Sequence, residues 1–131
     1  MIAGFEFGCR APLVTRRESI GQDVGGDQAW RLLYASDLHL TRRRQDLAAQ
    51  IVSVVAHERP HAVLLGGDLI DRRNGIPVLQ HMVQSLEAVS PVVAISGNHD
   101  VARGVDAVRD AVLAGGGHWL CDQEFVLQHA T

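Results

Sequence analysis

The chain has 131 residues, of which 47% are apolar and 21% are charged, and its formal net charge at pH 7 is −3. This length suits one domain or a part of one, and the apolar fraction is sufficient for a buried core. The slight negative charge gives no indication of a nucleic acid partner, and no apolar run reaches the ~20 residues that a membrane-spanning helix needs.

Residues 1–29 carry the weakest structural pattern of the chain. Short apolar segments at 5–7 and 13–15 are compatible with edge strands, and the Gly- and Asp-rich segment 21–27 predicts a loop. We therefore assign 1–29 to edge strands or a flexible extension that precedes a domain of residues 30–131. The segment lacks the basic, apolar and small-residue order of a signal peptide, so we expect a cytoplasmic protein and leave open a peripheral association with the inner face of the membrane.

The two cysteines, Cys9 and Cys121, lie far apart in the sequence. They show neither the close spacing of a metal motif nor the pattern of a disulfide framework. Free thiols are the rule in the reducing compartment expected above, so we expect both cysteines to be free.

From residue 30 onward, segments with the length of strands alternate with longer segments at helical spacing. Apolar runs predict strands over 31–36, 62–65 and 92–95, and shorter strands over 119–120 and 125–127. Apolar residues at every third or fourth position predict helices over 46–58, 76–89 and 101–114. This alternation predicts an α/β fold with a mostly parallel sheet and right-handed crossovers. Because the strands are apolar along their length, we expect a sheet that is covered on both faces.

Three polar clusters follow the first three of these strands. They are Asp37-x-His39, Gly67-Asp68-x-x-Asp71 and Gly97-Asn98-His99-Asp100. Asp68 lies 31 residues after Asp37, and Asn98 lies 30 residues after Asp68, an interval that suits one strand and one crossover helix. Since the sites of open parallel sheets lie at the carboxyl ends of the strands, we expect the three clusters to form one site.

The residue types in these clusters are those of a metal site. Asp37 and His39 lie two positions apart just beyond a strand, where period-two alternation would point both side chains the same way, toward one ion. Asp68 could bridge two ions, and Asn98 offers a neutral oxygen to the second. This mixture of oxygen and imidazole ligands suits two divalent ions of Mn, Fe or Zn better than Ca²⁺. Two such ions can activate a bridging water and hold a phosphoryl group for in-line attack.

His99 directly follows the Asn98 position and is the candidate catalytic group. An imidazole there can donate to a phosphate oxygen or protonate the leaving group. Asp100 could orient that ring, which would make it a catalytic residue as well. We expect Asp71 to support a ligand without binding an ion itself. Aspartates at strand ends also cap the helices that follow, so capping is an alternative role for both Asp71 and Asp100.

Arginines follow each cluster closely. All 12 basic residues are Arg, and half of them are Arg42, Arg43, Arg44, Arg72, Arg73 and Arg103. Because the guanidinium group binds phosphate through paired hydrogen bonds, Arg42, Arg72 and Arg103 are our candidates for substrate binding. The alternative is a solvated loop or helix face. An anionic lipid headgroup is a further candidate for the bound group.

In order, spacing and strand context, the three clusters resemble the first three motifs of the calcineurin-like metallophosphoesterases. The resemblance covers residues 30–128. It implies a metal-dependent hydrolase of phosphodiester, phosphomonoester or pyrophosphate bonds that uses a two-metal-activated water. The metal ligands that it implies are Asp37, His39 and Asp68 for one ion, with Asp68 bridging, and Asn98 for the other. His99 would be the catalytic histidine.

Two segments resemble a narrower group within the family. Residues 34–40 and 114–120 are similar to the bacterial branch, which includes phosphodiesterases and the UDP-2,3-diacylglucosamine pyrophosphohydrolases of lipid A synthesis. This likeness implies a phosphorylated small-molecule or lipid-linked substrate. It names no partner chain, and the oligomeric state stays open.

The sequence departs from the family pattern after the third cluster. The family adds a histidine and then a Gly-His-x-His motif, and these 131 residues contain neither in that context. Since the family fold is a longer two-sheet α/β sandwich, we expect residues 30–131 to form a partial metallophosphoesterase domain, the N-terminal portion of that sandwich. The alternative is a truncated or non-catalytic form that binds metal or serves as a scaffold for other proteins.

Overall fold

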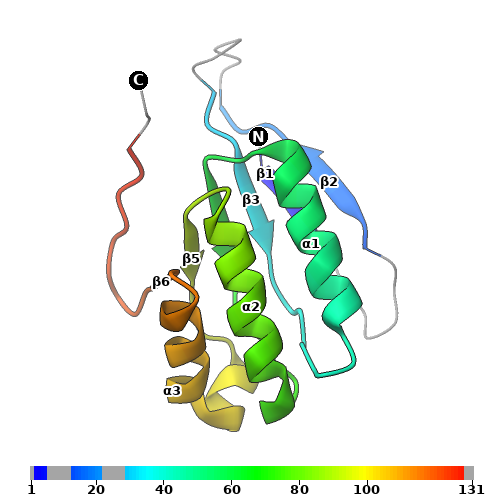
Figure 1. Ribbon diagram of the computed structural model, residues 1–131. Coiled ribbons are helices and arrows are strands. Elements are labelled where there is room, and N and C mark those ends of the chain that lie inside the picture. The colour runs from blue at the N-terminus through cyan, green and yellow to red at the C-terminus, as the bar shows by residue number, and fades with distance from the viewer. Residues whose placement is uncertain (1, 6–12, 22–28, 129–131) are drawn as a thin grey trace.

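The computed structural model describes residues 2–5, 13–21 and 29–128, and for residues 2–5 and Arg103 it describes the backbone alone (Figure 1). The predictions that concern Cys9 and residues 6–7, and most of the predicted loop at 21–27, lie outside these residues. Within the described ranges, no helix has the length and apolar character that crossing a bilayer requires. Cys121 is exposed and free.

A six-stranded sheet in the order β2-β1-β3-β4-β5-β6 forms the centre of the structure. Its strands are β1 (Ile2–Phe5), β2 (Thr15–Glu18), β3 (Leu32–Ala35), β4 (Ala62–Leu65), β5 (Val92–Ala94) and β6 (His118–Trp119). The β1–β2 pair is antiparallel, and the other described pairs are parallel. The predicted α/β fold with a mostly parallel sheet is confirmed.

Three helices and a short 3₁₀ turn connect the parallel strands. They are α1 (Gln45–Glu58), η1 (Arg73–Gly75), α2 (Ile76–Glu87) and α3 (Asn98–Ala114). All three α-helices lie on the same face of the sheet, with α2 between α1 and α3 (Figure 1). The reason is topological: the chain crosses from β3 to β6 in one direction, and right-handed crossovers in one direction place every helix on one face.

The core lies between these helices and one face of the sheet. Alternate strand residues such as Leu33, Val63 and Val92 are buried there against Ile51 and Leu79 from the helices. This alternation follows from the strand period of two residues.

The opposite face of the sheet has no helix among the described elements. Tyr34, which alternates with the buried Leu33, is 37% exposed. The expectation of a sheet covered on both faces is therefore not met by the described elements. An apolar strand pattern shows that burial is favourable on both faces, but the direction of the crossovers decides which face the helices occupy.

Two predicted elements also differ from the structure, one in its starting residue and one in its existence. Helix α3 begins at Asn98, three residues before the predicted start, so the third polar cluster lies in its first turn. The helix is kinked at Gly104, whose φ and ψ angles are 104° and 85°. The strand predicted over 125–127 is wrong, because this segment has no regular structure and Val126 is 74% exposed. Short alternating patterns do not form strands without a partner edge.

Candidate metal centre

The segments that follow β3 and β4 stay paired beyond the ends of the strands. The backbone N–H of Asp37 donates to the carbonyl of Gly67 at 3.0 Å, and that of His39 donates to the carbonyl of Asp68 at 3.0 Å. These bonds hold the first polar cluster beside the second. The carboxyl ends of the strands thus form a continuous edge, as the sequence predicts.

Three residues at this edge have left-handed backbone conformations. The φ angles are 56° for Asp37, 45° for His39 and 51° for Asp68. Such angles are uncommon outside glycine, although Asp and His adopt them more readily than most residues, and they concentrate at functional sites. They also end the strand pleat, so period-two alternation does not govern where Asp37 and His39 point. Strand alternation therefore does not support a common direction for these two side chains, and their ligation of one ion stays a prediction.

The third cluster approaches the second through two glycines. A Cβ atom on Gly67, whose φ is +99°, would lie 2.7 Å from the backbone nitrogen of Gly97. A Cβ atom on Gly97 would overlap both the backbone nitrogen and the carboxylate of Asp68. Only residues without a side chain allow the two segments to come so close. In the sequence, each of these glycines is notable only as the first residue of a polar cluster.

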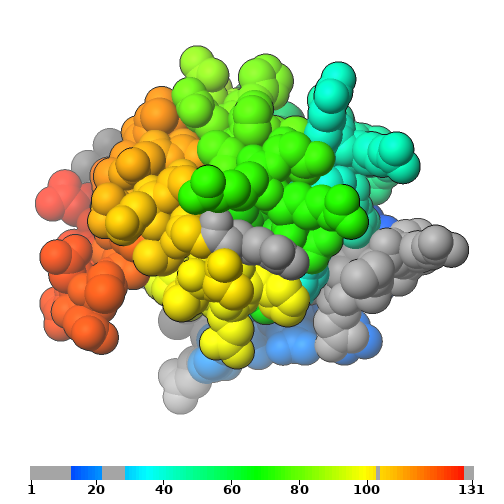
Figure 2. All heavy atoms as spheres, turned by 90° about the horizontal axis from the view of Figure 1, so that it is seen from below, coloured from blue at the N-terminus to red at the C-terminus, as the bar shows by residue number. Residues whose placement is uncertain are grey.

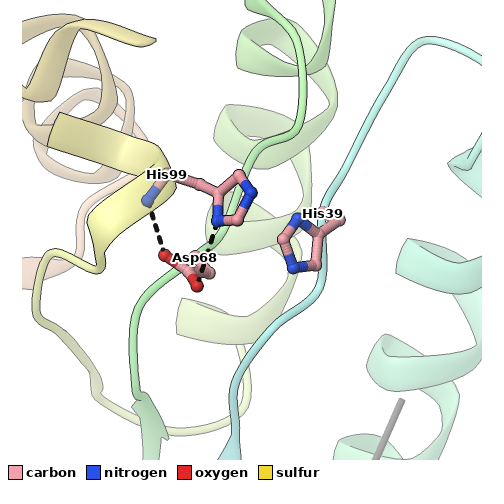
Figure 3. A group of neighbouring side chains, drawn as sticks. All are labelled: His39, Asp68 and His99. Atoms are coloured by element: carbon pink, nitrogen blue, oxygen red, sulfur yellow. Dashed lines mark hydrogen bonds and ion pairs between the residues drawn. The ribbon is translucent and has the colours of Figure 1, made fainter. Parts of the chain in front are cut away.

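His39, Asp68 and His99 meet at this edge from three different segments (Figure 3). One potential ligand atom from each lies within 4.8 Å of the other two. The backbone N–H of His99 donates to Asp68 Oδ1 at 2.8 Å, and its ring Nδ1 lies 3.3 Å from Asp68 Oδ2. The two imidazole rings stand edge to face, with centroids 4.6 Å apart. A carboxylate and two imidazoles in this arrangement form a donor set suited to a transition metal or zinc.

The charge state of Asp68 suits this role. Burial alone would raise the pKa of its carboxyl group, but the hydrogen bonds from the backbone and ring of His99, together with the nearby His39, outweigh burial and lower that pKa. The side chain therefore stays ionised at lower pH than an ordinary aspartate. Metal ligands must be deprotonated, so this shift favours ion binding.

The lowered pKa of Asp68 predicts a particular loss of stability in acid. A carboxyl group with a lowered pKa in the folded state stabilises the fold fully above its unfolded pKa of about 3.9, and this contribution disappears as pH falls through the folded value. We expect the melting temperature of metal-free wild-type protein to fall more steeply than that of Asp68→Asn between about pH 5 and about pH 3. Thermal melts in the presence of a chelator measure both slopes, and equal slopes would contradict the prediction.

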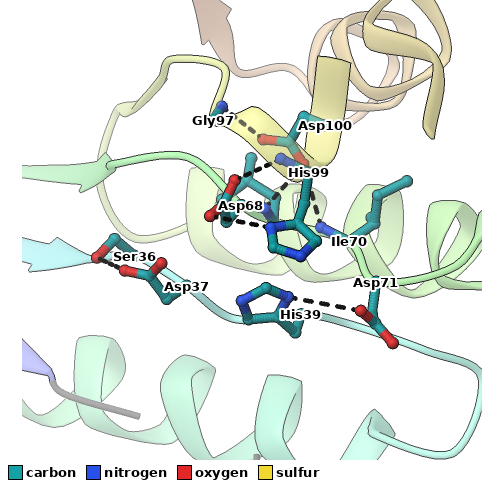
Figure 4. Close-up of polar contacts among 10 residues, drawn as sticks. Ser36, Asp37, His39, Asp68, Ile70, Asp71, Gly97, His99 and Asp100 are labelled. Carbon is teal, nitrogen blue, oxygen red and sulfur yellow. Dashed lines mark hydrogen bonds and ion pairs between the residues drawn. The ribbon is translucent and has the colours of Figure 1, made fainter. Parts of the chain in front are cut away.

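Asp37 and Asn98 lie at the same edge but outside the group of three. Both are exposed. Asp37 Oδ2 accepts a hydrogen bond from Ser36 Oγ at 2.7 Å (Figure 4). Their metal ligation stays a prediction. Ser36 itself was overlooked in the sequence, where it marks only the end of a predicted strand.

Asp71 lies behind the cluster on the side of His39. Its Oδ1 atom is 3.6 Å from His39 Nδ1, a distance for an ion pair rather than a good hydrogen bond (Figure 4). From this position a carboxylate can orient the ring of a histidine ligand. The arrangement is compatible with the supporting role expected for Asp71.

Asp100 does not contact the His99 ring. Its side chain is fully buried, and its two oxygens accept hydrogen bonds from the backbone N–H groups of Leu69, Ile70 and Gly97 (Figure 4). The prediction that Asp100 orients His99 is therefore wrong. The bond from the N–H of Gly97, the residue before the first turn of α3, is the acidic half of a capping box, so the alternative role in helix capping is the one observed.

Two of the predicted substrate arginines, Arg42 and Arg72, lie on the segments that follow the first two polar clusters. Arg42 and Arg72 are exposed, and the backbone N–H of Arg42 donates to Asn74 Oδ1 at 3.2 Å, which ties the two arginine-bearing segments together. Asn74 was not singled out in the sequence, although asparagine is common in such turns. Figure 2 looks onto this side of the molecule, where the yellow start of α3 lies beside the green segment around α2. Arg103 lies in the first part of α3, where the structure describes its backbone alone.

The comparison with known families accounts for this geometry. A model of the calcineurin-like phosphoesterase family matches residues 31–127. The chain belongs to this family. It matches no curated protein and no solved structure. Calcineurin-like phosphoesterases are metal-dependent hydrolases of phosphoesters, and the donor set of His39, Asp68 and His99 fits a divalent ion in type, spacing and ionisation.

Proposed function

We propose that this calcineurin-like phosphoesterase hydrolyses a phosphodiester, phosphomonoester or pyrophosphate bond with the help of two divalent ions. The convergence of His39, Asp68 and His99 at the carboxyl edge of the sheet carries this proposal. When bound, the ions would polarise phosphoryl oxygens and lower the pKa of a water molecule.

We infer that the ions are Mn, Fe or Zn. The residues proposed to hold them are Asp37, His39, Asp68 and Asn98. Both oxygens of Asp68 contact His99, so the carboxylate lies between the second and third clusters, which suits the bridging position proposed for it. Asp37 and Asn98 are exposed at the same edge, so Asp37 could join His39 and Asp68 at the first ion, and Asn98 could bind the second, without repacking of the core.

His99 is proposed as the catalytic residue. Its backbone is fixed by the bond to Asp68 Oδ1, while its side chain is 49% exposed. A ring held at its base and open to solvent can donate to a phosphoryl oxygen or protonate the leaving group.

The substrate is proposed to be a phosphorylated small molecule or a lipid-linked phosphate. Arg42 and Arg72 are exposed on the segments that follow the first two polar clusters, and guanidinium groups there would bind phosphate oxygens in pairs. We also propose that the protein is similar in function to the bacterial phosphodiesterases and UDP-2,3-diacylglucosamine pyrophosphohydrolases. Its proposed location is the cytoplasm, and Arg103 is proposed to bind the substrate together with Arg42 and Arg72.

Metal content and hydrolysis test the proposal together. We expect the protein supplied with Mn²⁺ to bind two ions per chain, measured by mass spectrometry, and to hydrolyse a generic aryl phosphodiester. Absence of both binding and turnover would instead support the scaffold alternative.

Replacement of His99 separates catalysis from metal binding. If Asp37, His39, Asp68 and Asn98 hold the ions and the His99 ring contacts the substrate instead, His99→Asn should lower kcat by about 10²- to 10⁴-fold, the range for loss of a general acid, with Mn²⁺ affinity nearly unchanged. His57→Asn is the matched control, because the His57 side chain is 84% exposed on α1. A loss of Mn²⁺ affinity in His99→Asn would show that His99 is a ligand, and unchanged kcat would remove it from the reaction.

A further inference from the structure

Asp100 is an unusual residue in the described part of the molecule. Its side chain is 0% exposed, and Ser90, at 3%, is the other buried polar residue there. A buried carboxylate costs free energy unless hydrogen bonds replace its water. The contacts that Asp100 makes must therefore account for its position.

The contacts of Asp100 come from two separate segments of the chain. Oδ1 accepts from the N–H of Leu69 at 2.9 Å and from that of Ile70 at 3.3 Å. Oδ2 accepts from the N–H of Gly97 at 2.9 Å. The first two donors directly follow Asp68, and the third begins the turn that carries His99. One carboxylate thus joins the segment after β4 to the start of α3.

Helix capping explains only part of this arrangement. Capping of α3 by Asp100 uses only the bond that Oδ2 accepts from the N–H of Gly97, within the same turn. The two bonds to Leu69 and Ile70 cross to another segment and contribute nothing to the cap. Asp68 directly precedes Leu69, and His99 directly precedes Asp100. The two bonds to Asp100 therefore hold Asp68 and His99 at a fixed distance.

We propose that Asp100 is a positioning residue that clamps the Asp68 segment to the His99 turn and so sets the geometry of the metal centre. The contacts that depend on it are the 2.8 Å bond from the His99 N–H to Asp68 Oδ1 and the 3.3 Å approach of the His99 ring to Asp68 Oδ2. Asp100 touches neither the ion nor the substrate. This inference rests on the proposed function only in taking the cluster as a metal site.

The variant Asp100→Asn tests the clamp at nearly constant volume. An amide offers one acceptor oxygen and one donor group, so it can satisfy Gly97 or the Leu69 side but not both. We expect Mn²⁺ affinity, measured by calorimetry, to fall by about 10- to 100-fold, the range for loss of a group that orients metal ligands. The NMR signals of the His99 ring should shift as well.

Ser90→Ala is the matched control. It removes the other buried polar side chain, which donates from Oγ to the carbonyl of Pro60 at 2.5 Å near the opposite ends of the strands. It should lower the melting temperature but leave Mn²⁺ affinity and the His99 signals unchanged. If Asp100→Asn behaves like Ser90→Ala, the carboxylate is a structural residue only and the clamp is refuted.

A measurement on wild-type protein decides the question if Asp100→Asn does not fold. The clamp predicts that the amides of Leu69 and Ile70 exchange with solvent as slowly as those of β4, because both are bonded to a buried acceptor. Exchange at the rate of an exposed loop would overturn it. Failure of wild-type protein to bind Mn²⁺ would count against the proposed function, while amide exchange and the His99 signals would still test the clamp.

Discussion

Asp68→Asn is expected to abolish phosphoester hydrolysis and to lower Mn²⁺ affinity by more than the 10- to 100-fold typical of a group that only orients ligands. Asp68 contacts His99 through both of its oxygens, and it is the one carboxylate of the three-residue cluster. Removing its charge removes the anionic ligand. Calorimetry with Mn²⁺ and turnover of an aryl phosphodiester measure the two effects.

Asparagine is the appropriate replacement because of the backbone at this position. Asp68 has a φ of 51°, a left-handed conformation that Asn tolerates well and that would strain Ala. An amide oxygen can also keep the bond from the His99 N–H. The variant therefore changes charge with little change of shape. Retention of wild-type affinity and turnover would exclude Asp68 as a ligand.

Asp106→Asn is the control for the loss of one negative charge. Asp106 lies on α3 with its side chain 80% exposed, 3.2 Å from Arg109. Surface ion pairs of this kind contribute little to stability, and Asp106 is no part of the cluster. We expect its replacement to leave Mn²⁺ affinity unchanged, so an equal loss in both variants would point to net charge rather than ligation.

The position of the site could be predicted from the sequence, but the partners of each side chain could not. Strand ends and their spacing place Asp37, Asp68 and Asn98 at one edge, because parallel topology leaves few alternatives. Local conformation then decides which groups meet. His39 and His99 enter the cluster while Asp37 turns to Ser36, since the left-handed backbone after β3 replaces the strand alternation that the prediction assumed.

The role of Asp100 was inaccessible for a different reason. Proximity to His99 in sequence suggests a contact with its ring, yet residues in the first turn of a helix point in successive directions around the axis. Asp100 is thus buried toward Leu69 while His99 faces solvent. The capping alternative was correct because it depends only on position within the turn, whereas the bonds to another segment depend on tertiary packing.

Gly97→Ala is expected to disrupt the metal centre almost as strongly as Asp68→Asn, although it adds only one methyl group and removes no ligand. Its φ and ψ angles of −112° and 179° are accessible to any residue, so alanine brings no backbone strain here. The cost is steric, because the new Cβ would overlap the backbone nitrogen and the carboxylate of Asp68. Overpacking of this kind typically costs about 1–3 kcal/mol.

Backbone atoms cannot move aside as a flexible side chain can, so the two segments must separate. Separation breaks the bonds of Asp68 to His99, and we expect the free energy of unfolding in urea and the Mn²⁺ affinity to fall together. Gly116→Ala is the informative control. Gly116 has a φ of +91° and its nearest neighbouring atom would lie 3.7 Å from a new Cβ, so alanine there is strained but not overlapped. It should lower stability without changing Mn²⁺ affinity. If Gly97→Ala also leaves affinity intact, close approach of the two segments is not what holds Asp68 against His99.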